Sequence, residues 1–288
     1  MSRLPVVATI RDAYLFTLHH LGAVIGLIWV PMLALTVTGF FSMHRYYSDL
    51  IDALASGNAA NLGPSILMML GYLVAALLLY AVILVSVVQL ALGQRTGSVM
   101  AHFSFGALEW RTFRALAGLF GLALMLMLTV VLAGNAVLAL VSGSSHIGEA
   151  QGGTILLLLV YFLLVACAPR FLMLLPAVAV AETGPALRRC WALSAGNFWR
   201  LLAVLVAMIL PVLVLFAGAE ALLASAAPPL DTASDKMLMI SGLMRARQVL
   251  PLMSGLSFLF SPFLVALFCG ASISAWRALK GEQADQTA

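Results

Sequence analysis

Charged residues are scarce in this chain of 288 residues. Asp, Glu, Lys and Arg together make up 9% of it, whereas hydrophobic residues make up 63%. A soluble globular domain carries about 25% charged residues. The chain therefore has too few polar side chains to cover a water-exposed globule. We expect lipid to be the solvent around most of it.

The chain also lacks the residue patterns that hold metals or build a disulfide framework. Its three cysteines share no metal-ligand spacing, and an odd number cannot form a closed set of disulfides. We expect them to be small buried apolar residues. The five histidines show no paired spacing and are interpreted as interfacial, so no metal or cofactor is predicted. These residues are Cys167, Cys190, Cys269, His19, His20, His44, His102 and His146.

Several functional motifs are missing as well. The sequence has no phosphate-binding glycine loop and no nucleophile motif, and it shows no cluster of polar side chains at one membrane depth. We therefore predict that the protein is not an enzyme. The basic residues are not interleaved with exposed aromatic residues, which argues against nucleic acid as a partner. The first apolar run, about 21–43, is too long for the core of a cleavable signal peptide and is interpreted as a membrane span.

What the chain has in abundance is long apolar segments. A bilayer core about 30 Å thick needs about 20 apolar residues, and only a helix satisfies its own backbone hydrogen bonds there. The sequence therefore predicts an all-α polytopic membrane helix bundle, forming one domain over residues 1–288, with about six spans. The predicted spans are 21–43, 64–92, 115–141, 154–180, 201–224 and 251–275.

The segments between these spans also carry predictions. Residues 1–20 have apolar residues at helical spacing and predict a short amphipathic helix on the inner membrane surface. Residues 46–63 and 225–250 are expected to be outer loops, with a surface helix at 237–243 in the second of them. The tail 277–288 is expected to be disordered.

The distribution of Lys and Arg predicts the orientation. Eleven of the 15 cations fall on the side that holds both termini, and four fall on the other. Positive charge marks the cytoplasmic side. Both termini are therefore predicted to be cytoplasmic, in the inner membrane of a bacterial cell. The four cations of the other side are Arg45, Lys236, Arg245 and Arg247.

The densest group of arginines lies in residues 169–200, between the fourth and fifth predicted spans, a stretch that we call the elbow. Arginines bind lipid phosphates and tryptophans favour the headgroup layer, so the elbow is predicted to lie at the cytoplasmic interface. Residues 185–196 are predicted to form a helix that lies parallel to the membrane in this interface and begins with Pro185 in its first turn. Its candidate functional or structural residues are Arg170, Pro176, Glu182, Arg188, Arg189, Trp191, Asn197, Trp199 and Arg200.

Arg170 allows two interpretations. One is an arginine that extends its side chain to the interface above a kink or break between Pro169 and Pro176. The other pairs Arg170 with Glu182, or with Glu109 of the neighbouring inner loop, so that the ion pair locks the elbow.

The pattern Arg170…Pro176-Ala…Glu182…Ala-Leu-Arg-Arg-Cys-Trp-Ala-Leu-Ser-Ala-Gly-Asn-Phe-Trp-Arg200 resembles a signature of bacterial membrane proteins. The group comprises the membrane domain attached to some glycerophosphodiester phosphodiesterases and the related uncharacterised YciC-like inner-membrane proteins. The resemblance covers about 31 residues and departs at Cys190, where the group often has Ser. No phosphodiesterase domain is recognised, so the resemblance implies a membrane module without hydrolase activity.

Two functions remain open from the sequence. The first is a non-catalytic module with a scaffolding or lipid-interacting role in envelope maintenance, with anionic headgroups as partners and a membrane protein or a second copy as a further possible partner. The second is a small-molecule transporter or lipid translocator, suggested by the prolines of the fourth span, a weak internal repeat and the intramembrane Glu220.

Overall fold

The computed structural model describes residues 4–60, 62–94, 106–142, 167–225 and 235–281, and every regular element in these residues is a helix. This confirms the prediction of an all-α fold. The helices are α1 (Val6–Ser56), α2 (Leu62–Ala91), α3 (Ala107–Ser142), an unlabelled helix Cys167–Ala181, α5 (Ala186–Ser194), α6 (Phe198–Ser225) and α7 (Asp235–Lys280).

Four of these helices are long and apolar enough to cross a membrane, namely α1, α2, the Ala107–Thr129 part of α3, and α7 from Lys236. A fifth candidate is the bent pair of α5 with the Phe198–Val214 part of α6, which turns by 105° at the break. Residues 154–166 of the predicted fourth span, 154–180, lie outside the described residues. The count of six spans therefore stays a prediction.

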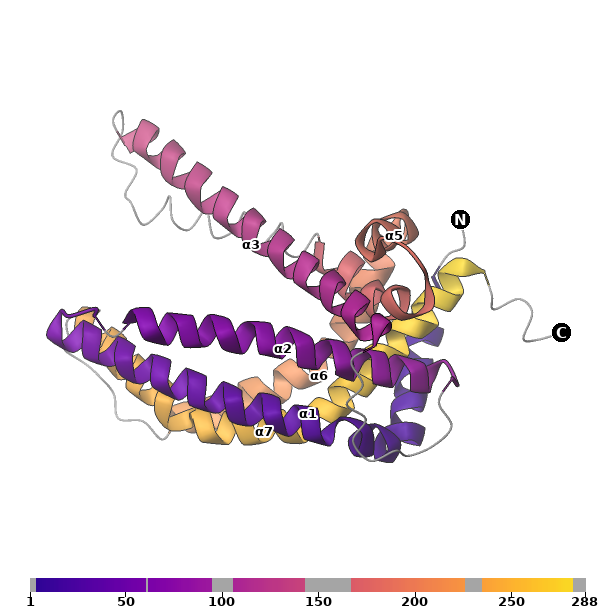
Figure 1. The fold of residues 1–288 in the computed structure, drawn as a ribbon, viewed down its shortest axis with the longest axis horizontal. Helices are drawn as coiled ribbons and strands as arrows, with labels where there is room; N and C mark the ends of the chain where they lie inside the picture. Colours follow the sequence, from indigo (N-terminus) through magenta and orange to yellow (C-terminus); the bar gives the residue numbers. More distant parts are fainter. Residues whose placement is uncertain (1–3, 61, 95–105, 143–166, 226–234, 282–288) are drawn as a thin grey trace.

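Several predicted boundaries are wrong because the helices continue past the apolar runs. α1 is one helix of 51 residues, so residues 46–56 extend it and do not form a loop, and the N-terminal amphipathic segment is its beginning. In Figure 1 that beginning, drawn in the darkest indigo, runs at a steep angle to the rest of α1. Residues 237–243 belong to α7, which also includes residues 277–280 of the tail.

The core of the bundle is the packing of α1 against α7, with α2 beside both and α6 making smaller contacts with each (Figure 1). The two long helices approach closely where Gly270 of α7 faces Ala13 and Phe16 of α1. Small residues permit such backbone proximity in membrane helices. Side chains of α1 at helical spacing, including Val24, Ile28 and Met32, are buried in this core.

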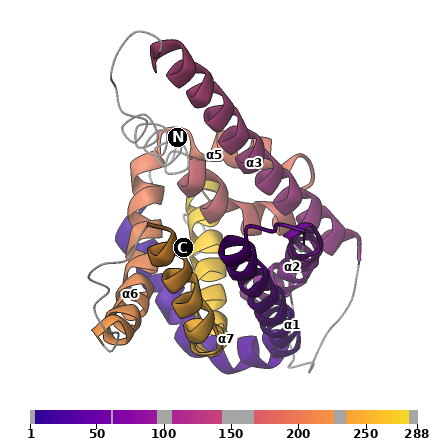
Figure 2. The ribbon, with the colours of Figure 1, turned by 90° about the vertical axis from the view of Figure 1, so that its left-hand side faces the viewer.

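α3 leaves the bundle at an angle, as both views show (Figures 1 and 2). Only 6% of the residues in the most apolar stretch of α3 are buried inside the protein. Side chains such as Leu124, Met125 and Leu128 are exposed. Exposed apolar side chains in this number fit a lipid environment and not water.

The described cations gather at two opposite ends of the molecule. The starts of α1 and α3, the helix α5 and the end of α7 lie together at one end in Figure 1, and the end of α1 and the start of α7 lie at the other. This matches the predicted grouping of cations into two sides. Which end faces the cytoplasm stays a prediction.

Candidate functional site

The elbow is built from three segments that turn sharply. The helix Cys167–Ala181 is continuous through Pro176, so a break between the two prolines is wrong. α5 follows as predicted, although Pro185 lies just before the helix and not in its first turn. Gly196, at φ 76°, then turns the chain into α6. A positive φ of this kind favours glycine.

Glu182 is the centre of a cluster that joins the elbow to the end of α7. Its carboxylate accepts a hydrogen bond from the indole Nε1 of Trp276 at 2.9 Å. It forms ion pairs with Arg189 Nε at 2.7 Å and with Lys280 Nζ at 3.4 Å. Lys280 also lies 4.5 Å from the centre of the Trp276 ring. Two cations, one indole and one carboxylate therefore hold α5 to α7.

This cluster sets the charge state of Glu182. The side chain is only 11% exposed, and its burial raises the pKa of the carboxyl. The hydrogen bonds from Trp276 and Arg189 and the positive charges of Arg189 and Lys280 oppose that effect and outweigh it, so the pKa lies below the usual value of 4.5. Glu182 is therefore ionised at neutral pH and acts as a structural anion.

Arg170 does not form the predicted ion pair with Glu182. Its guanidinium carbon lies 4.1 Å from the centre of the Trp191 ring and 5.4 Å from that of Phe198. Its Nε is buried without a hydrogen-bond partner. Glu109 accepts a hydrogen bond from the backbone N–H of Gly106, at the start of its own helix, 2.9 Å away. Aromatic faces therefore take the place of a carboxylate at Arg170.

The start of the chain is bound to the elbow. The backbone N–H of Leu4 donates to Oδ1 of Asn197 at 3.2 Å, and Arg200 donates to the carbonyl oxygen of Leu4 at 3.4 Å. Both Leu4 and Asn197 are buried. Nothing in the local sequence of residue 4 or of residue 197 indicates this bond, because 193 residues separate its partners.

Three of the elbow's candidate residues, Arg188, Trp191 and Trp199, are exposed. Trp191 is 51% exposed and Trp199 is 76% exposed, as tryptophans of a membrane–water interface are. Arg188 is exposed and lines a cleft of about 400 Å³ together with Glu182 and Arg189. The buried face of α5 is formed by Ala186, Cys190 and Ser194, one per turn. Cys190 is fully buried on this face and packs in the hydrophobic core.

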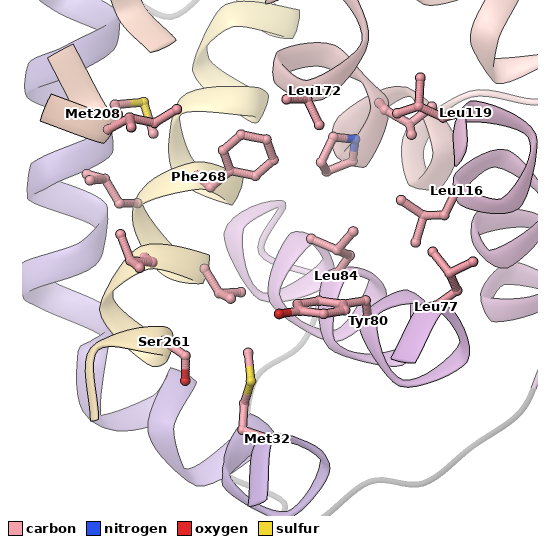
Figure 3. A pocket seen from close by; sticks show the side chains of 16 residues that line it. Met32, Leu77, Tyr80, Leu84, Leu116, Leu119, Leu172, Met208, Ser261 and Phe268 are labelled. Atoms are coloured by element: carbon pink, nitrogen blue, oxygen red, sulfur yellow. The ribbon is translucent and has the colours of Figure 1, made fainter. Parts of the chain in front are cut away.

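The sequence did not indicate an apolar cavity of about 400 Å³ that lies between the helices (Figure 3). α1, α2, α3, α6, α7 and the helix Cys167–Ala181 all contribute to its wall, and Tyr80 and Ser261 carry its hydroxyl groups. The other labelled lining residues in Figure 3 are Met32, Leu77, Leu84, Leu116, Leu119, Leu172, Met208 and Phe268. Pro176 is the candidate residue of the elbow that reaches this cavity.

A more polar cleft of about 280 Å³ adjoins the cavity and shares Met32, Tyr80 and Ser261 with it. We call it the hydroxyl cleft, because Thr36, Tyr72, Tyr80, Ser254, Ser257 and Ser261 line it. It lies between α1, α2 and α7, and its lining reaches Met43 of α1 and Leu250 of α7. Together the two spaces join an apolar region to a region rich in hydroxyl groups.

Glu220 lies within α6, and its side chain is outside the described part of the structure. Its role as an intramembrane polar residue therefore stays a prediction. Within the described ranges, no three His, Cys, Asp or Glu side chains come together in a way that would hold a metal ion. Comparisons with family models, curated proteins and solved structures found no match to this chain. The resemblance to the YciC-like group therefore rests on the elbow residues alone.

Proposed function

We propose that this protein is a non-catalytic module of the bacterial inner membrane that binds phospholipid, with its elbow at the cytoplasmic headgroup layer. The observation that carries the proposal is the apolar cavity of about 400 Å³ among helices long enough to span a membrane. Ligand sites are typically concave, mostly apolar and about 300–1,000 Å³ in volume. In a bilayer the abundant apolar ligand is a lipid acyl chain.

The elbow supports this proposal at the headgroup level. Exposed Trp191 and Trp199 favour the interfacial layer, and the exposed Arg188 favours anionic headgroups. Glu182 forms ion pairs with Arg189 and Lys280 and holds the elbow against α7. The elbow is therefore held against α7 and presents Arg188 on its exposed surface. A second copy or another membrane protein as a partner stays a prediction.

The proposal is tested with a phospholipid that carries a photoreactive group near the end of its acyl chain. The full-length protein is reconstituted in nanodiscs with this lipid, irradiated, and the crosslinked residues are mapped by mass spectrometry. We expect crosslinks to concentrate on the cavity wall. Replacing Leu119, which lines the cavity, by Trp fills it from the α3 side and lowers these crosslinks.

The matched control is Leu122→Trp on the same helix. Leu122 is 46% exposed and does not line the cavity, so its replacement is expected to leave the cavity crosslinks unchanged. Crosslinks spread evenly over the exposed apolar surface, and unaffected by Leu119→Trp, would refute the proposal.

The hydroxyl cleft favours a second candidate function, a lipid translocator. Movement of a headgroup through a membrane needs polar groups along its path, and the cleft supplies hydroxyls next to the apolar cavity. Liposomes containing the protein and a fluorescent phospholipid, treated with a membrane-impermeant quencher, measure this activity. A translocator exposes the inner-leaflet lipid faster than protein-free liposomes do, and equal rates would exclude the function.

A further inference from the structure

A third cleft lies where the first turns of α3 face the start of α5, and we call it the arginine cleft. Its volume is about 360 Å³, and its wall is formed by Arg111, Arg114, Ala115, Gly184, Pro185, Ala186 and Leu187. Leu187 of α5 packs toward Gly118 of α3, at 3.4 Å from the position that a Cβ would take there. The contact between these two helices therefore forms the cleft.

The two arginines of this cleft lack the compensation that the Glu182 cluster provides. Arg111 and Arg114 are three residues apart on α3, so their side chains share one face of the helix. Nε and Nη2 of Arg111 are buried and have no hydrogen-bond partner. Neither guanidinium forms an ion pair with any carboxylate of the described residues. The Arg111 residue is half-buried and Arg114 is exposed. A buried guanidinium nitrogen without a partner is unfavourable unless an anion joins it.

The start of α5 adds backbone donors to the same cleft. The first N–H groups of a helix have no acceptor within the helix and carry a partial positive charge. Pro185 precedes α5, has no N–H of its own, and offers no side-chain hydrogen bond to cap the helix. Ala186 and Leu187, the first two residues of α5, line the cleft. Arginine forks and a helix start are both suited to phosphate.

Neighbouring residues of α3 line the arginine cleft and the apolar cavity. Ala115 lines the cleft, and the next residue, Leu116, lines the cavity together with Leu119. In Figure 3 both leucines extend from α3 toward the cavity. From Arg111 to Leu116 the helix rises by about 7.5 Å. A lipid with its phosphate at Arg111 therefore has its acyl chains beside the cavity.

We propose that the arginine cleft binds the phosphate of an anionic phospholipid whose acyl chain enters the apolar cavity. This inference rests on the proposed lipid-binding function and adds the headgroup class and the residues that recognise it. In the sequence, Arg111 and Arg114 were two of the eleven cations assigned to the predicted cytoplasmic side. The signal that it did contain is their spacing of three residues at the start of an apolar helix.

The test compares two lipids with identical acyl chains. The full-length protein is reconstituted in nanodiscs that contain equal amounts of phosphatidylglycerol and phosphatidylcholine, and native mass spectrometry counts the lipids of each kind that stay bound. We expect phosphatidylglycerol to be enriched several-fold over phosphatidylcholine. In Arg111→Gln/Arg114→Gln we expect the ratio to fall to that of the bilayer while the total bound lipid is largely kept.

Two further variants make the result specific. Arg245→Gln/Arg247→Gln removes the same charge from α7 at the other end of the bundle and is expected to keep the enrichment. Arg111→Lys/Arg114→Lys keeps the charge and is expected to keep part of the phosphatidylglycerol enrichment. This lysine variant replaces the glutamine variant if the glutamine variant fails to fold. Enrichment that survives in the glutamine variant, or that is abolished equally in the control, would overturn the arginine site.

Failure of the broader function gives a different result. If no lipid stays bound to the wild type, or if Leu119→Trp leaves the total unchanged, the proposed function is refuted. A separate titration with inorganic phosphate, followed by thermal unfolding in neutral detergent, examines the free ion as the ligand. If inorganic phosphate stabilises the protein as much as phosphatidylglycerol does, and the glutamine variant loses both effects, the lipid assignment is overturned in favour of free phosphate.

Discussion

Gly270 gives the sharpest test of how the bundle is packed, because it lies where α1 and α7 come closest. A Cβ at this position would be 2.9 Å from Cδ1 of Phe16 and 3.4 Å from both Cα and the carbonyl oxygen of Ala13. The backbone of α1 cannot yield without a shift of the whole helix. Gly270→Ala therefore overpacks the central interface, at a cost of about 1–3 kcal/mol.

The same substitution has a favourable component that needs a control. Alanine favours the helix over glycine by about 1 kcal/mol. Gly255 lies in the same helix α7 and has no atom within 4 Å of its would-be Cβ, so Gly255→Ala is expected to keep this gain. We expect Gly270→Ala to be less stable than Gly255→Ala by about 1–3 kcal/mol, and Gly270→Val to lose more.

The assay is thermal unfolding of each variant in the same detergent, followed by tryptophan fluorescence. One kcal/mol moves Tm by about 2–4 °C in chains of 150–250 residues, so the two alanine variants are expected to differ measurably. Equal Tm values for Gly270→Ala and Gly255→Ala would mean that α1 and α7 do not meet at this residue. The packing on which the cavity depends would then be wrong.

Other predictions concern the elbow. Glu182→Gln removes two ion pairs and weakens the bond from Trp276, so we expect a loss of about 1–3 kcal/mol in unfolding measurements, whereas a wild-type Tm would contradict the cluster. The folded pKa of Glu182 lies below its usual value of 4.5, so its ionised carboxylate stabilises the folded protein above pH 4.5. This stabilisation is lost as the pH falls through the folded pKa. The Tm difference between wild type and Glu182→Gln is therefore expected to shrink over that range. Asn197→Ala frees the N–H of Leu4 and is expected to speed proteolysis near the N-terminus, with Trp199→Ala, which alters an exposed neighbour, as the control. Trp191→Leu removes the ring that faces Arg170 and is expected to cost about 0.5–2 kcal/mol, and an unchanged Tm in that variant would contradict the cation–π contact.

The sequence by itself determined that the protein is helical and that several helices are apolar enough to lie in a membrane. Both follow from local properties, since a run such as 64–92 has too many apolar residues for water and must satisfy its own backbone bonds. α2 coincides with that run almost residue for residue. The helix α5 was also readable, because Gly196 and Asn197 end it. Helix ends outside the apolar runs could not be predicted from the sequence, since polar residues at 46–56 and 277–280 can continue a helix as well as form a loop.

Only the tertiary structure decided which side chains meet. The partners of Glu182 include Trp276 and Lys280, almost a hundred residues away, and Arg170 faces Trp191 where an ion pair had been expected. The physical reason is that lipid accepts apolar side chains on every face of a helix. Hydrophobic periodicity then no longer marks the packed face, as it does in water. The apolar cavity and the arginine cleft arise where faces of several helices converge, and that convergence is not encoded in any one segment.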